Sequence, residues 1–63
     1  MCLAVVYVEK SNEEREEVRD VTYLEADDHG FRVVSLMGEE RHIDGRLKSV
    51  DFWLEHKVSI EQE

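Results

Sequence analysis

The single cysteine of the chain, Cys2, is the residue best suited to bind a metal ion. If Met1 is excised, Cys2 carries a thiolate and a free amine, which together close a five-membered chelate. If Met1 is retained, the thiolate can anchor a metal that displaces protons from neighbouring backbone amides, a mode that suits square-planar nickel(II) or copper(II). The alternative is that Cys2 is a small buried hydrophobe at the start of an apolar strand, which is the commoner role of a free cysteine.

The Cys2 site is incomplete within one chain. One thiolate with one nitrogen fills half of a square plane, and a two-fold dimer would supply the other half. A chain of 63 residues has a thin core, and its single cysteine excludes an intrachain disulfide, so a metal or self-association is the expected means of stabilisation. We therefore expect a homodimer with Cys2 of each chain at the axis, which would also cover the apolar first strand.

The three histidines and the acidic run are weaker candidates. His29, His42 and His56 lie in or beside predicted turns and are separated by thirteen and fourteen residues, so none shows a zinc-ligand spacing. The run 13–17 lacks the alternating spacing of a calcium loop, which favours a solvated rim. In the strand expected around residues 50–54, strict alternation of side chains points Phe52 inward and Trp53 outward. An outward tryptophan favours an interface.

Residues for catalysis are few. The three glycines all stand in turn contexts and form no phosphate-binding loop, and no serine has the spacing of a nucleophile elbow. A domain of this size also has little room for a pocket that excludes water. We predict that the protein is not an enzyme.

The composition restricts the partners and the compartment. Sixteen acidic against eight basic residues give a net charge of −8, the wrong sign for binding a phosphate backbone, so nucleic acid is disfavoured. The charge is better explained as a means of staying soluble. No secretory signal is recognisable and the longest apolar run, residues 2–8, is too short to span a bilayer, so we expect a cytoplasmic protein without a membrane segment.

The residue pattern predicts short strands separated by turns. Residues 2–9 are apolar at nearly every position, which predicts a central strand, whereas 10–17 are predicted to form a polar loop. The further predicted strands are 18–25, 31–37, an edge strand at 41–43, one around 50–54 with Val50, Phe52 and Leu54 on one face, and 58–61; the predicted turns are 27–30, 38–39 and 44–45, with a connection at 55–56. This pattern predicts an all-β single domain over residues 1–63, a small barrel or sandwich of five or six short antiparallel strands.

Three segments resemble the CooT family of small nickel-binding proteins. They are MCLA at 1–4, LMGEE at 36–40 and VDFWLEHKV at 50–58, and their order and spacing match nearly end to end. The resemblance implies a compact SH3-like or Sm-like β-barrel, commonly dimeric, that delivers nickel to carbon monoxide dehydrogenase. It implies Ni(2+) as the metal and Cys2 as its ligand, joined by the adjoining backbone amide of Cys2 or Leu3.

Two other functions stay open. The first is an Sm-like or SH3-like interaction module that binds a protein or RNA. Binding of RNA would need a basic patch, for which Arg41, Arg46, Lys48 and Lys57 are the candidates. The second is a structural or regulatory subunit with no ligand of its own. The metal hypothesis is distinguished from both by the role of Cys2: a nickel metallochaperone or storage protein loses its metal when that thiolate is removed.

Overall fold

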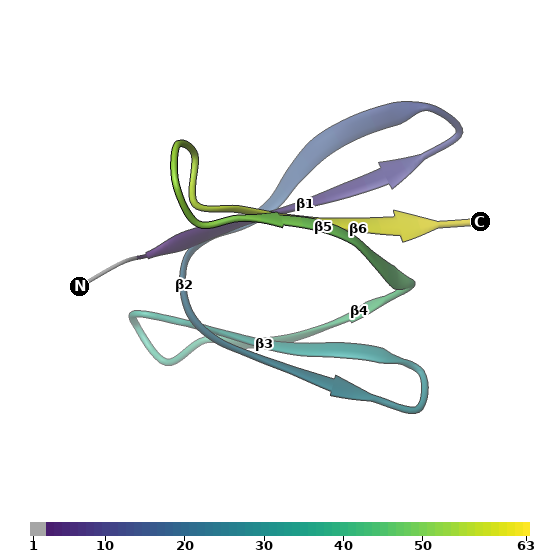
Figure 1. Ribbon diagram of the computed structural model, residues 1–63. Helices are drawn as coiled ribbons and strands as arrows, with labels where there is room; N and C mark the ends of the chain where they lie inside the picture. Colours follow the sequence, from purple (N-terminus) through teal and green to yellow (C-terminus); the bar gives the residue numbers. More distant parts are fainter. Residues whose placement is uncertain (1–2) are drawn as a thin grey trace.

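A computed structural model describes residues 3–63, in which all the regular structure consists of β-strands (Figure 1). The six strands form one sheet in the order β4-β3-β2-β1-β6-β5. Their bounds are β1 Ala4–Lys10, β2 Glu13–Asp27, β3 Gly30–Ser35, β4 Glu40–Asp44, β5 Arg46–Asp51 and β6 Lys57–Gln62. The prediction of an all-β fold of five or six strands is confirmed.

The first strand lies inside the sheet, as its apolar sequence predicts. β1 pairs with β2 on one side and β6 on the other, and its Val6 and Val8 side chains are buried. The pairing of β1 with β6 is parallel, so the expectation of antiparallel pairs throughout is wrong at this position. The buried apolar core is Val6, Val8, Val18, Val21, Phe31, Val33, Ile43, Val58 and Ile60.

The acidic stretch after β1 is a strand, not the predicted loop. Ser11 and Asn12 both have positive φ, 54° and 65°, which allows a tight two-residue hairpin turn and lets β2 start at Glu13. The acidic side chains that follow are mostly exposed, and cations from other strands contact some of them: Lys57 lies 2.7 Å from Glu14. Strand pairing with β1 therefore outweighs the polar composition that favoured a loop.

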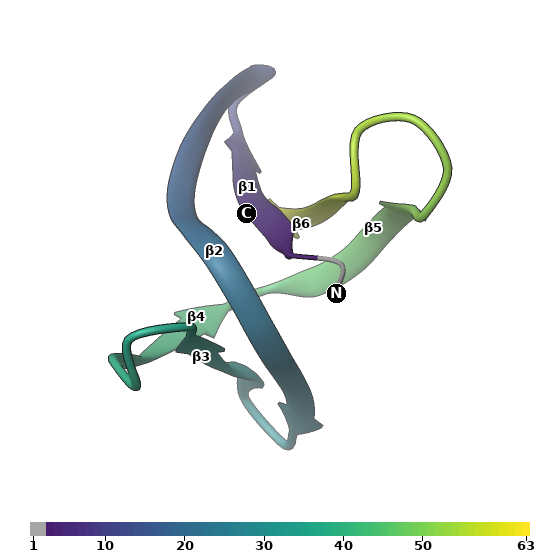
Figure 2. The same cartoon turned by 90° about the vertical axis from the view of Figure 1, so that its left-hand side faces the viewer.

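The sheet curls strongly but does not close into a barrel. β4 and β5 are its two edges, and Gly45 is the single residue between them. One residue is too few for a hairpin, so β5 continues in the direction of β4 and does not fold back beside it (Figures 1 and 2). The predicted turn at 44–45 thus joins two edge strands that are not hydrogen-bonded neighbours.

The prediction that Phe52 and Leu54 continue an inward strand face is wrong. β5 ends at Asp51, whose carboxylate oxygen Oδ1 accepts hydrogen bonds from the backbone N–H groups of Trp53 at 2.8 Å and Leu54 at 2.9 Å. The carboxylate turns the chain out of the sheet, because these N–H groups bond to it and not to a strand ladder. The three side chains that follow Asp51 are consequently exposed.

Candidate functional site

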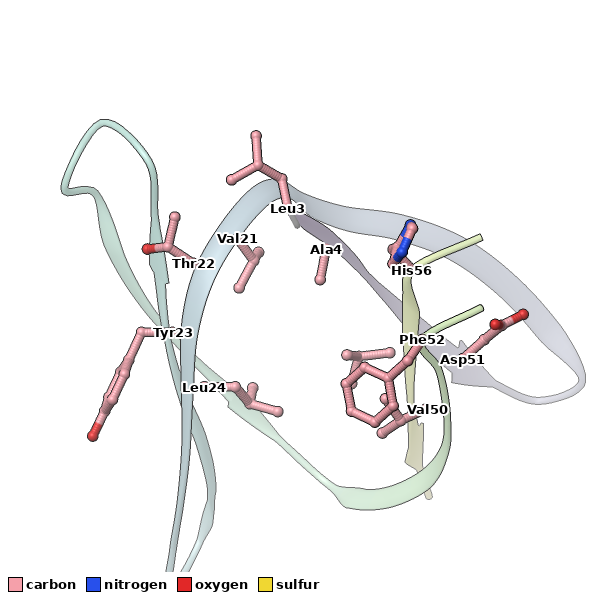
Figure 3. A pocket seen from close by; sticks show the side chains of 11 residues that line it. Leu3, Ala4, Val21, Thr22, Tyr23, Leu24, Val50, Asp51, Phe52 and His56 are labelled. Carbon is pink, nitrogen blue, oxygen red and sulfur yellow. The ribbon is translucent and has the colours of Figure 1, made fainter. Parts of the chain in front are cut away.

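An apolar hollow lies at the N-terminal end of β1. Its volume is about 350 Å³, and it lies open to solvent between β2 and the chain around the β5–β6 connection (Figure 3). This space is here called the N-terminal hollow. The residues that line it are Leu3, Ala4, Val21, Thr22, Tyr23, Leu24, Val50, Asp51, Phe52, His56 and Val58. In Figure 3 Val21, Leu24 and Phe52 point into this space, whereas the Tyr23 side chain points away from it.

Leu3 is the one predicted metal-binding residue that the structure describes. It lies one residue before β1, is half-buried and contributes to the rim of the N-terminal hollow. Cys2, the other predicted ligand, lies outside the described residues. Because Leu3 precedes the strand pairs, which begin at Ala4, its backbone nitrogen is outside the β1–β2 ladder.

His56 contributes to the same hollow, although its position in the sequence suggested only a solvated turn. Its side chain is half-buried, and its backbone has a positive φ of 49°. The backbone N–H of Val5 donates a 2.9 Å hydrogen bond to the His56 carbonyl oxygen, one step before the parallel pair of Val5 with Lys57. The pairing of β1 with β6, which sequence patterns do not specify, brings this histidine beside the start of β1.

The other two histidines both contact Asp27, His42 through its ring and His29 through its backbone N–H. The Nε2 atom of His42 lies 3.0 Å from Asp27 Oδ2 and its Nδ1 atom 3.3 Å from Asp44 Oδ1, while the His29 backbone N–H donates to Asp27 Oδ1 at 2.8 Å. This last hydrogen bond is the main reason why the pKa of Asp27 is lowered. Within residues 3–63 no group of three or more potential side-chain ligands is arranged to hold a metal ion.

The charged surface is extensively paired. Seven of the eight cationic side chains lie within ion-pair distance of a carboxylate, among them Lys48 with Glu9 at 2.7 Å and Arg41 with Glu17 at 2.8 Å. The cations in these pairs are Arg15, Arg19, Arg32, Arg41, Arg46, Lys48 and Lys57. The four residues considered for an RNA-binding patch are all in this set, so their charge is largely offset locally.

Comparison with solved structures identifies the class of fold. A crystal structure assigned as CooT from Carboxydothermus hydrogenoformans superposes with a TM-score of 0.86 over 98% of this chain and 98% of that chain, at 19% sequence identity. This similarity shows that the two chains share a fold. No curated protein matches the sequence.

The sequence itself identifies the family. The family described as CO dehydrogenase accessory protein CooT matches residues 1–61, and the chain belongs to this family. The resemblance seen in the three sequence segments is confirmed. An accessory protein is not itself the catalyst, so membership agrees with the prediction of a non-enzyme. Residues 3–63 include no helix long and apolar enough to cross a membrane.

Proposed function

We propose that the chain is a nickel(II)-binding metallochaperone, or a nickel delivery or storage factor, that serves the maturation of carbon monoxide dehydrogenase. The observation that carries this proposal is the match of residues 1–61 to a family of accessory proteins of that enzyme. The nickel ion is cargo: the protein binds it, keeps it in a defined geometry and releases it to the client. This takes place in the cytoplasm.

The proposed ligands are the Cys2 thiolate and the backbone nitrogen of Leu3. A thiolate is a good ligand for late first-row metals, and a deprotonated amide beside it favours square-planar nickel(II). The position of Leu3 supports this assignment, because its backbone nitrogen precedes the first strand ladder. Two copies of this half-site, related by a two-fold axis, would complete the square plane, so we propose a homodimer.

A nickel titration followed by thiolate-to-nickel charge-transfer absorbance tests this function. The native chain should saturate at one nickel per two chains, whereas Cys2→Ser should show no charge-transfer band. The oligomeric mass of both proteins is measured with and without metal. A Cys2→Ser variant that binds nickel as the native chain does would refute the assignment, and saturation at one nickel per chain would refute the shared site.

A further inference from the structure

The imidazole ring of His42 lies between two carboxylate groups. Its Nε2 atom is 3.0 Å from Asp27 Oδ2, and its Nδ1 atom is 3.3 Å from Asp44 Oδ1. The sheet register brings these residues together, because Asp27 at the end of β2 pairs with Gly30, and Gly30 pairs with Asp44 at the end of β4. Gly30 has no side chain, so the ring of His42 can reach across it to Asp27.

A neutral histidine ring cannot satisfy both carboxylates. It has one N–H donor, and its other nitrogen presents a lone pair. When Nδ1 donates to Asp44, the lone pair of Nε2 faces a carboxylate oxygen of Asp27, which also has only lone pairs, and the two atoms repel each other. A cation between Nε2 and Oδ2 removes this repulsion. That cation is either a second proton on the ring or a metal ion.

The arrangement has the parts of a histidine metal site. A histidine that binds a metal almost always donates its other ring N–H to a carboxylate, a carbonyl or water, which fixes the tautomer and orients the ring. Asp44 is placed to accept that hydrogen bond from Nδ1. Two ligand atoms that are each about 2.1 Å from a metal, at a right angle, lie about 3 Å apart. This separation agrees with the 3.0 Å between His42 Nε2 and Asp27 Oδ2.

Asp27 is positioned to act as the second ligand. Its Oδ1 atom accepts the backbone N–H of His29 at 2.8 Å, which fixes the carboxylate and leaves Oδ2 facing His42. This hydrogen bond first, and the contact with His42 to a smaller extent, lower the pKa of Asp27, so the carboxylate is ionised at neutral pH. The side chains of His42 and Asp27 are each 43% exposed, so water molecules can occupy the remaining coordination positions.

The surrounding charges favour a cation at this position. The cationic residue opposite His42 in the strand register is Arg32 of β3, and its guanidinium is already paired with Glu25 and Glu40. Alternation along β2 and β4 puts these two glutamates on the same face of the sheet as the two aspartates beside His42. Four carboxylates against one guanidinium give this face a negative local potential, which attracts a divalent cation.

We propose that His42 Nε2 and Asp27 Oδ2 bind a divalent first-row transition-metal ion, with Asp44 as the carboxylate that orients the ring and water as the remaining ligands. Imidazole suits nickel(II), copper(II) and zinc(II), whereas magnesium and calcium take oxygen ligands. The site shares no residue with the N-terminal hollow and does not depend on Cys2. It has only two protein ligands, so it fills after the proposed thiolate site.

Calorimetric titration of the full-length Cys2→Ser variant with nickel(II) tests this site, because that variant has no thiol. One nickel(II) ion should bind per chain, with paramagnetic broadening of the NMR signals around His42 and no charge-transfer band. Adding Asp44→Ala should weaken binding by about 10- to 100-fold, as loss of an orienting carboxylate does, and adding His42→Ala should weaken it at least as much. Adding His29→Ala is the matched control, because His29 contacts Asp27 through its backbone N–H, and it should leave binding unchanged.

Each result decides for or against the site. If Cys2→Ser binds no nickel(II), the cation beside His42 is a proton and the proposal is overturned. Binding that His42→Ala leaves unchanged would overturn it as well, because the metal would then be held elsewhere. Zinc(II) should displace the nickel, whereas an excess of magnesium should not, and displacement by magnesium would exclude an imidazole ligand. Failure of the Cys2 assignment is distinguishable, because it removes the charge-transfer band of the native chain and leaves this site unaffected.

Discussion

The backbone N–H of Val5 donates a 2.9 Å hydrogen bond to the carbonyl oxygen of His56, and this bond ties the beginning of β1 to the β5–β6 connection. Fifty-one positions separate the two residues in the sequence. The bond continues into the parallel ladder between Val5 and Lys57, so the start of β1 and the end of the β5–β6 connection are positioned by the same strand pair. Leu3 and His56, which line the same hollow, are therefore brought together by the fold.

The contribution of the Leu3 backbone nitrogen can be isolated with proline. Leu3→Pro removes the amide proton that nickel must displace, and it should abolish the diamagnetic, square-planar complex. Leu3→Ala keeps the amide and is the matched control. Because Leu3 precedes the strand pairs, neither change should unfold the domain. Nickel titrations with magnetic measurement check this, and a native-like diamagnetic complex in Leu3→Pro would exclude this nitrogen as a ligand.

Nickel binding should depend on pH. The thiol of Cys2 and any amide ligand must each lose a proton when the metal binds, so protons compete with nickel as the pH falls. We expect weak binding below neutral pH and stronger binding as the pH rises, with release of protons in unbuffered solution. Titrations at several pH values measure this dependence. Affinity that stays constant between acidic and alkaline pH would argue against a thiolate ligand.

Removal of a core side chain should lower the free energy of unfolding much more than removal of an exposed one. Ile60 is fully buried, at 0% exposure, and Ile60→Ala should lower the free energy of unfolding by about 2 to 5 kcal/mol, because a cavity remains in the core. Met37→Ala removes a side chain that is 90% exposed and should change it by less than about 0.5 kcal/mol. Urea unfolding of both variants measures this difference in stability. Equal unfolding midpoints for Ile60→Ala and Met37→Ala would contradict the prediction.

Gly45, between the two edge strands, should not tolerate a side chain. A Cβ atom there would lie 2.6 Å from the Glu61 carbonyl oxygen and 2.8 Å from Ile60 Cγ2, at a φ of +135°. We expect Gly45→Ala to destabilise the fold by about 3 kcal/mol or more, through backbone strain and overpacking together. Gly38→Ala adds a Cβ in open space at a φ of +85°, so only strain of about 1 kcal/mol is expected. Similar unfolding midpoints for the two variants would disprove this role of Gly45.

Acid should loosen the β5–β6 connection, residues 52–56, through Asp51. The backbone N–H groups of Leu54 and then Trp53 lower the pKa of this carboxyl group below its ordinary value of 3.8. Because the pKa is lower in the folded chain, the stabilisation is complete above about pH 4 and is lost as the pH falls through the folded pKa. Asp51→Asn keeps an acceptor oxygen but cannot titrate, so its melting temperature should fall less on acidification than that of the native chain. Asp28→Asn, in an exposed turn, is the control and should behave as the native chain.

Local pattern and turn chemistry predicted much of the fold. The apolar run at the start specifies a strand that must be covered on both sides, and the 27–30 turn has the residues that a turn requires: Asp27 accepts the His29 N–H, as an aspartate in a turn does. Two errors arose where local signals compete with pairing. Glu13–Glu17 is polar enough for a loop but pairs with β1, and Phe52 and Leu54 alternate as a strand does but follow an aspartate that ends it.

The sequence by itself determined the all-β class, the central first strand, the family and the one thiol available for a metal. These depend on side-chain types, on short-range periodicity and on the order of recognisable segments. Only the tertiary structure decided which distant residues meet. The parallel pairing of β1 with β6 places His56, Phe52 and Leu3 around one hollow, and the Asp51 turn exposes Trp53. Parallel pairing joins residues far apart in the chain through backbone hydrogen bonds, which leave almost no trace in residue types.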